Sequence, residues 1–182
     1  MPAWFFPEIN KAKKQMRRKI CREQIFILLF QIEFNDKEEY PFLMEQFREK
    51  EALTDEEKDY VEKKFNNITG QIDEIDKVIN EISADWSTNR MGKVELAILR
   101  LGYYEMAYDK DIPESVAINE AVELAKKYGT DESYIFINGV LGKCATDKER
   151  HKEASERQEK DKPWKGKNKG NVIVKGSSKK KE

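Results

Sequence analysis

Basic and aromatic residues recur at helical spacing near the start of the chain. Two arginines and two phenylalanines follow one another at intervals of four residues: Arg18, Arg22, Phe26 and Phe30. A helix would place these four side chains in one row. Guanidinium groups bind phosphates and aromatic rings stack on unpaired bases, so the row suits a single-stranded nucleic acid. The alternative is a core helix with a solvated basic end, and this segment taken alone favours that plainer interpretation.

The stretch that carries the row predicts a long helix. It reads RRKICREQIFILLFQ, and its first six residues hold four positive charges: Arg17, Arg18, Lys19 and Arg22. Apolar residues recur on another face with the period of a core-facing stripe; they are Cys21, Ile25, Leu28, Leu29 and Ile32. The continuous apolar run is far shorter than the ~20 residues of a membrane-spanning helix. We expect the rest of the chain to pack around this helix.

The charges are distributed very unevenly along the chain. Hydrophobic and charged residues each make up 38% of the 182 positions, so a modest core must lie beneath a polar surface. Residues 1–30 carry a net charge of +5, residues 31–147 of −13 and residues 148–182 of +7. A basic head and tail around an acidic body indicate one surface for a polyanion and another for a basic protein. Ordinary surface charge with a basic tail is the alternative.

The sequence offers little of what enzymes and metal sites need. His151 is the only histidine and lies in a charged stretch, which argues against a zinc site or a histidine-based triad. Cys21 and Cys144 lack metal-binding spacing, and two such thiols indicate a reducing, cytoplasmic environment. No glycine-rich loop follows a strand pattern. We therefore expect no catalytic residue, no metal and no cofactor.

Helix signals continue along the rest of the chain. Thr54 and Glu57 have the spacing of a capping box, and the helix that follows is expected to pause near Gly70. Residues 91–108 have helical periodicity. Pro113 then begins a helix that Gly129 ends. These signals predict a series of short helices after the long one.

An amphipathic segment after Pro41 and an Asn-Gly pair complete the pattern of predicted helices. After Pro41, the side chains expected to face the core include Phe42, Leu43 and Phe47. Asn138-Gly139 ordinarily marks a hairpin turn. No strand-like alternation flanks it, and a four-residue interval continues through it, which predicts a helix instead: Phe136, Val140 and Cys144. With no convincing strand anywhere, the predicted fold class is all-α.

The two ends of the chain differ from the segment between them. Residues 1–16 form an N-terminal extension with three aromatic residues before Pro7, where a helix could begin. Residues 148–182 form a charged, lysine-rich tail whose first part could extend the preceding helix. From Lys162 to Glu182 we expect disorder, because eight lysines and one apolar triplet cannot offset the entropy cost of ordering.

Four segments together resemble one protein family. They are RRKICRE with the following ILLFQ, then VELAILRLGYYEM, then DIPESVAINEAVELAKKYG, and finally SYIFINGVLGK. Their order and spacing resemble the NusB family of bacterial transcription antitermination factors, from about Arg17 to Lys143. The resemblance implies a non-catalytic domain over residues 17–147, with about seven helices in two small subdomains packed on a long first helix.

The resemblance also implies what the protein binds. The family pairs with the ribosomal protein NusE, binds the boxA element of ribosomal RNA leaders and helps RNA polymerase pass terminators; a weak homodimer is also compatible with it. The RNA is met by the basic start of the first helix, where we expect Arg18 and Arg22 to be exposed, and by the region opening the last conserved helix. The implied RNA-binding residues are Arg17, Arg18, Lys19, Arg22, Phe30, Glu132, Ser133 and Phe136.

Other polar residues of the matching segments have different expected roles. The acidic body should hold the basic partner protein, with Glu95 and Tyr104 as contacts. Arg100 and Glu105 are expected to make structural ion pairs, and Glu120 to fix helix packing. Two other functions remain open: a helical adaptor that binds proteins, and a ribosomal RNA biogenesis factor without sequence-specific RNA binding.

Overall fold

The computed structural model describes residues 5–50, 52–83 and 86–160, with side chains for 13–49, 52–83 and 86–147. Every regular element in this part of the chain is helical, which confirms the all-α prediction. The α-helices are α1 (Phe5–Gln31), α2 (Tyr40–Lys50), α3 (Asp55–Thr69), α4 (Ile72–Ile82), α5 (Lys93–Tyr108), α6 (Glu114–Tyr128) and α7 (Ser133–Lys160). Short 3-10 helices lie at Ile32–Phe34, Lys37–Glu39 and Thr88–Arg90.

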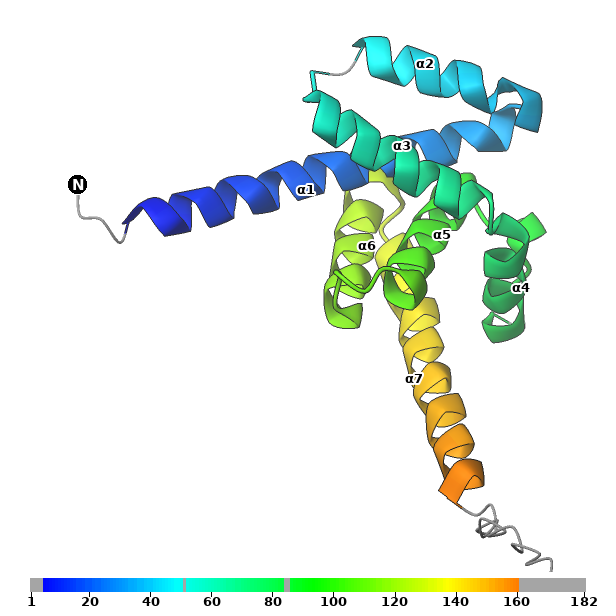
Figure 1. Ribbon diagram of the computed structural model, residues 1–182. Coiled ribbons are helices and arrows are strands. Elements are labelled where there is room, and N and C mark those ends of the chain that lie inside the picture. The colour runs from blue at the N-terminus through cyan, green and yellow to red at the C-terminus, as the bar shows by residue number, and fades with distance from the viewer. Residues whose placement is uncertain (1–4, 51, 84–85, 161–182) are drawn as a thin grey trace, which may run out of the picture.

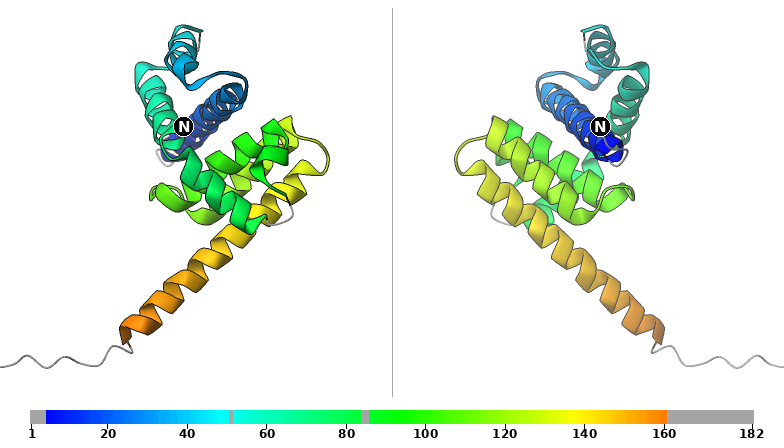
Figure 2. Two further views of the ribbon diagram at one scale, coloured as in Figure 1. Left: turned by 90° about the vertical axis from the view of Figure 1, so that its right-hand side faces the viewer. Right: turned by 90° about the vertical axis from the view of Figure 1, so that its left-hand side faces the viewer.

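Helix α1 is shared by two groups of helices. Helices α2 and α3 lie with it in one group, and α4 to α7 form a second group that packs on α1 chiefly through α5 (Figures 1 and 2). The first half of α1 and the second half of α7 extend beyond the two groups (Figure 1). This arrangement confirms the prediction of two small subdomains on a long first helix.

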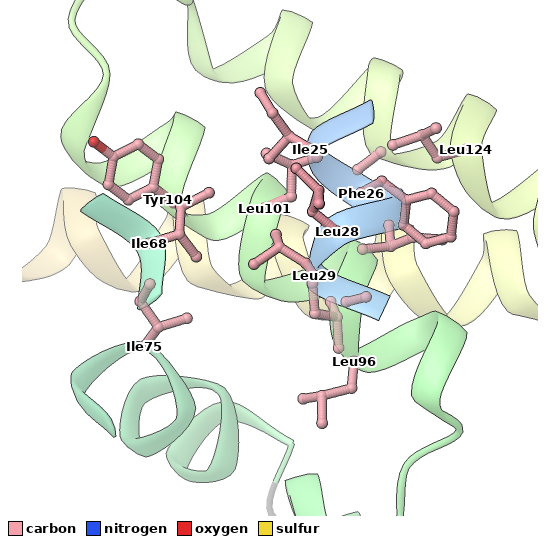
Figure 3. Packing of buried hydrophobic residues seen from close by; sticks show 14 of the residues in the cluster. Ile25, Phe26, Leu28, Leu29, Ile68, Ile75, Leu96, Leu101, Tyr104 and Leu124 are labelled. Carbon is pink, nitrogen blue, oxygen red and sulfur yellow. The ribbon is translucent and has the colours of Figure 1, made fainter. Parts of the chain in front are cut away.

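The apolar stripe of α1 lies at the centre of the core. All five predicted members are buried: Cys21, Ile25, Leu28, Leu29 and Ile32. Figure 3 shows side chains of α1 among those of α5 and α6, and the same hydrophobic cluster takes in Ile68 of α3 and Ile75 of α4. One continuous core therefore underlies both subdomains, and burial of this stripe fixes how α1 is rotated about its axis.

A small residue lets α5, α6 and α7 approach closely. A Cβ atom at Gly102 would lie 2.8 Å from a methyl carbon of Leu141 and 3.2 Å from the Cβ of Ala121.

Helix α7 runs without interruption through Asn138 and Gly139. This continuity confirms that the Asn-Gly pair is not a hairpin turn.

The predicted capping box at the start of α3 is present, whereas one core prediction for α2 is wrong. The Glu57 carboxylate accepts a hydrogen bond from the Thr54 backbone N–H at 2.9 Å, and the Thr54 hydroxyl accepts one from the Glu57 N–H at 3.4 Å. In α2, Phe47 and Met44 are buried, but Phe42 is 59% exposed. Phe42 precedes Met44 by two residues, or about 200° around the helix, and so lies on the opposite face.

The helices at the two ends are longer than the predicted domain. Helix α1 begins at Phe5, so most of the expected N-terminal extension belongs to the same helix as the basic segment. Helix α7 continues to Lys160, so the boundary expected at residue 148 is not a helix end. The disorder expected from Lys162 onward lies outside the described residues. Among the described helices, none has both the length and the hydropathy to cross a membrane.

Candidate nucleic-acid interface

The basic end of α1 carries cations at the surface. Arg18 is exposed and has no ion-pair partner among the described side chains. The Lys19 side chain is 48% exposed, with its Nζ 3.8 Å from a Glu120 oxygen. Arg17 donates two hydrogen bonds to Glu57 from a side chain that is 44% exposed. Exposed ion pairs contribute little stability, so Arg17 and Lys19 can exchange their carboxylate partners for a phosphate. Arg18 can bind a phosphate without breaking an ion pair.

Arg22 does not belong to this exposed group. It is only 8% exposed, and its Nε donates a 2.8 Å hydrogen bond to Glu105 while NH1 lies 3.1 Å from Glu120. Glu105 also accepts a 2.8 Å hydrogen bond from the buried Lys64. The expectation that Arg22 is exposed beside Arg18 is therefore wrong, because a buried carboxylate needs a paired cation. Arg22 holds α1 against α5 and α6.

Arg100 and Glu105 make the structural ion pairs that were predicted for them, because both are buried and bond to other helices. Arg100 is 6% exposed and donates two 2.8 Å hydrogen bonds to Asp76 of α4, as well as one to Glu33. Glu105 of α5 pairs with Arg22 of α1 and with Lys64 of α3. Together, these ion pairs hold the two subdomains to each other. Burial lowers the pKa of Lys64, but Glu105 and Tyr60 together raise it above its usual value.

The aromatic part of the row passes from buried to exposed along α1 and into the 3-10 helix Ile32–Phe34 that follows it. Phe26 is 3% exposed and packs on Tyr128, with ring centroids 4.8 Å apart. Phe30 is half-buried, whereas Phe34 is 66% exposed with its ring edge-on to that of Phe30, 5.1 Å between centroids. Phe30 can therefore still meet a base, but Phe26 cannot. Phe34 was not among the predicted site residues, although Phe34 continues the four-residue interval of the row by one step.

The three residues predicted to bind RNA at the start of α7 line one pocket; they are Glu132, Ser133 and Phe136. Its volume is about 290 Å³, and the ring of Phe136 lies 6.1 Å from the 55%-exposed Trp86. The pocket is lined by Trp86, Arg90, Met91, Gly92, Glu95, Thr130, Glu132, Ser133 and Phe136. Trp86 and Arg90 were not among the predicted site residues, because they precede α5 and no motif connects them with α7.

Ser133 shapes this pocket from inside the fold. It is 3% exposed, its hydroxyl donates to Glu95 and accepts a 2.8 Å hydrogen bond from the Thr130 N–H. A Cβ atom at Gly129 would lie 2.5 Å from the Ser133 side chain, so a glycine is needed where α6 ends. The Ser133 hydroxyl is thus used within the protein, while Glu132 is exposed. Glu95, predicted to meet the protein partner, lies beside the predicted RNA-binding residues.

Tyr104 does not lie on an open surface. It is 8% exposed, its hydroxyl accepts a 3.2 Å hydrogen bond from Asn67 of α3, and its ring lies 5.6 Å from that of Tyr108. Such a residue holds α3 to α5. The expected partner contact at Tyr104 is therefore corrected to a packing role.

Comparisons with known proteins converge on one family. Residues 19–146 match the model of the NusB family. Among curated proteins, transcription antitermination protein NusB of Agathobacter rectalis is 50% identical over 131 residues, covering 71% of this chain and all of that protein. The NusB of Lachnoclostridium phytofermentans is 44% identical, covering 70% of this chain and 98% of its relative.

Solved structures give the same answer. NusB of T. maritima has a TM-score of 0.63 at 35% identity, covering 71% of this chain and 90% of the other. A crystal structure of the antitermination factors NusB and NusE with double-stranded RNA has a TM-score of 0.58 at 28% identity, covering 70% and 94%. On the evidence of the family model, these relatives and the shared fold, the chain belongs to the NusB family.

Proposed function

We propose that this protein is a transcription antitermination factor that binds boxA-type single-stranded RNA together with the ribosomal protein NusE, without catalysing a reaction. The names of its relatives and the NusB–NusE–RNA complex among its structural neighbours support this function. The observation that carries it is the exposed basic end of α1, in Arg18 and Lys19, on a NusB-family fold.

Phosphate binding would provide most of the affinity. Arg17, Arg18 and Lys19 would neutralise RNA phosphates and release condensed counterions, so that affinity falls as salt rises. Arg22 would act indirectly, by holding the helix that presents the other three. This division assigns one of the four predicted cations to the fold and three to the RNA.

Base contacts would then provide sequence preference. Phe30 and Phe136 would offer aromatic surface to unstacked bases. The exposed Glu132 carboxylate, at the pocket, would accept hydrogen bonds from base amino groups. Ser133 would position these neighbours through its bonds to Glu95 and Thr130.

NusE would meet the acidic body of the protein. Residues 31–147 carry a net charge of −13, which complements a basic partner. Glu95 is the proposed contact, and its place in the pocket would put the protein partner next to the RNA. The complex would act on RNA polymerase in the cytoplasm, and the free protein would form at most a weak homodimer.

Fluorescence anisotropy tests the proposal. A labelled RNA carrying boxA and a composition-matched scrambled RNA are titrated with the full chain, with and without NusE, at several salt concentrations. We expect tighter binding to boxA, a further gain with NusE and a steep decrease with salt. Binding to NusE without salt-dependent RNA affinity would instead indicate a protein-binding adaptor. Equal affinity for both RNAs would indicate a biogenesis factor without sequence recognition.

A further inference from the structure

A line of side chains continues from the basic end of α1 along its contact with α6. We call it the α1–α6 seam, and it consists of Glu23, Phe30, Lys127 and Tyr128, continued by Phe34 in the 3-10 helix that follows α1. Nζ of Lys127 lies 2.5 Å from a Glu23 oxygen, which also accepts a hydrogen bond from the Tyr128 hydroxyl. Lys127 also lies 5.1 Å from the centre of the Tyr128 ring. The seam therefore joins a cation to an aromatic surface.

The seam begins where the basic end of α1 stops. Lys19 contacts Glu120 of α6, and Glu23, one turn further along α1, contacts Lys127, seven residues further along α6. The next contact joins Phe26 to Tyr128, with Phe30 one turn beyond. Lys127 thus lies between the exposed cations of α1 and the half-buried Phe30.

Lys127 has the exposure that a phosphate contact needs. Its side chain is 57% exposed, and an ion pair at such a site is worth little, so a phosphate can share the ammonium group with Glu23. Burial raises the pKa of Glu23, but hydrogen bonds from Lys127 and Tyr128 lower it overall, so this carboxylate keeps its charge and holds Lys127 in place. A fixed, accessible cation results.

Phe34 has the exposure that base stacking needs. At 66% it is the most exposed of the large hydrophobic side chains in the described part of the chain. Phe30 supports the ring by an edge contact, at an interplanar angle of 66°, which leaves ring surface of Phe34 open to a base. The ring is therefore oriented by its neighbour and still accessible.

We propose that bound single-stranded RNA continues along the α1–α6 seam, with a phosphate on Lys127 and a base stacked on Phe34. This inference rests on the proposed RNA binding and extends its surface by two contacts. A nucleic acid fits better than a protein, because Lys127 and the exposed Phe34 continue the surface that begins with the cations Arg18 and Lys19. A groove that offers both cations and an exposed aromatic ring is typical of proteins that bind single strands.

Matched variants of the full chain test each contact. Lys127→Ala is compared with Lys126→Ala, the preceding residue of the same helix, which is 51% exposed and pairs with Glu123. Phe34→Ala is compared with Phe42→Ala, which is 59% exposed on α2, and with Phe34→Trp, which keeps a stacking surface. Each protein is titrated with single-stranded boxA RNA at several salt concentrations and checked by thermal melting. Arg18→Ala and binding to NusE are measured alongside.

We expect Phe34→Ala to weaken RNA binding at least about fivefold and Phe34→Trp to restore it. Lys127→Ala should reduce the salt slope by about 0.7, whereas Lys126→Ala and Phe42→Ala should resemble wild type. If both test variants bind RNA normally while Arg18→Ala does not, the seam is wrong and the proposed function stands. Equal losses in the control variants, or loss of NusE binding alone, would also overturn the seam. A wild-type protein without RNA affinity would overturn both proposals.

Discussion

Arg18 and Arg22 lie one turn apart on α1 in opposite environments. Arg18 is exposed, so its guanidinium is available to a phosphate. Arg22 lies between Glu105 and Glu120 and is 8% exposed. Removing it would leave Glu120 with the distant ammonium of Lys19 and Glu105 with Lys64 alone. The same residue type therefore serves recognition at one position and folding at the other.

Alanine substitutions separate these two roles. Arg22→Ala should lower the free energy of unfolding by about 3 kcal/mol, because it breaks a buried ion pair. Arg18→Ala should change that free energy by less than about 0.5 kcal/mol. It should instead reduce the salt slope of RNA binding by about 0.7. Urea unfolding and RNA titration at several salt concentrations measure both; an Arg18→Ala protein that unfolds early but binds RNA normally would reverse the assignment.

The environment of Phe136 leaves two roles open to its ring, which are RNA binding and core packing. It is half-buried beside Trp86 in the pocket, so part of its ring is open. Phe136→Ala should cost about 1–3 kcal/mol of RNA binding free energy, and Phe136→Tyr should retain the affinity. If Phe136 acts only in the core, the alanine variant would instead lose ~3–5 kcal/mol of stability. Thermal melts beside RNA titrations distinguish the two outcomes.

Helices whose ends depend on local chemistry were predictable from the sequence. The Thr54–Glu57 capping box, the break near Gly70 and the end of α6 at Gly129 all occur as expected. Each depends on residues within one turn. The start of α1 was harder, because the alternative starts at Phe5 and Pro7 differ by only two residues and local sequence does not fix a helix end that sharply. Local signals also gave no reason to end α7 before Lys160.

The cap of α3 should make stability depend on pH. Hydrogen bonds from Arg17 and from the Thr54 backbone lower the pKa of Glu57 from 4.5 to about 2. Between these values the unfolded chain binds a proton that the folded protein does not. This contribution to stability is therefore complete above about pH 5 and disappears as pH falls toward 2.

Unfolding by urea at a series of pH values measures this effect. Glu57→Gln should be less stable than wild type at neutral pH, and the difference should shrink as the pH falls toward 2. Asp55→Asn, at an exposed neighbouring position on α3, is the control and should follow wild type. A constant difference between wild type and Glu57→Gln at all pH values would contradict the pKa assignment.

At the level of the whole molecule, the site depends on contacts that local patterns do not contain. Arg22 pairs with Glu105, 83 positions later, so the periodicity of α1 could place it in the basic row but not report its burial. Trp86 and Arg90 reach the pocket only because α5 and α7 pack together. Motif resemblance predicted Glu132 and Phe136 as RNA contacts, and both residues line this pocket. Burial of Tyr104 followed from α3 packing on α5.

The segment from Lys162 to Glu182 contributes strongly to the uneven charge distribution of the whole chain. This segment carries eight lysines and one acid and lies outside the described residues. A tethered polycation raises the effective concentration of any RNA that it touches but reads no sequence. Deleting it should therefore weaken binding to boxA and scrambled RNA alike, most at low salt, and leave the boxA preference and Tm nearly unchanged.

A variant of equal length in which glutamine replaces these eight lysines is the matched control for that deletion. If charge is responsible, it should bind like the deletion, because the segment remains while its cations are lost. If the lysines instead contributed to recognition, the ratio of affinities for boxA and scrambled RNA would fall in both variants. A lower Tm in the deletion alone would show that the segment packs on the helices. We expect the two variants to have equal affinity, an unchanged ratio and the Tm of the full chain.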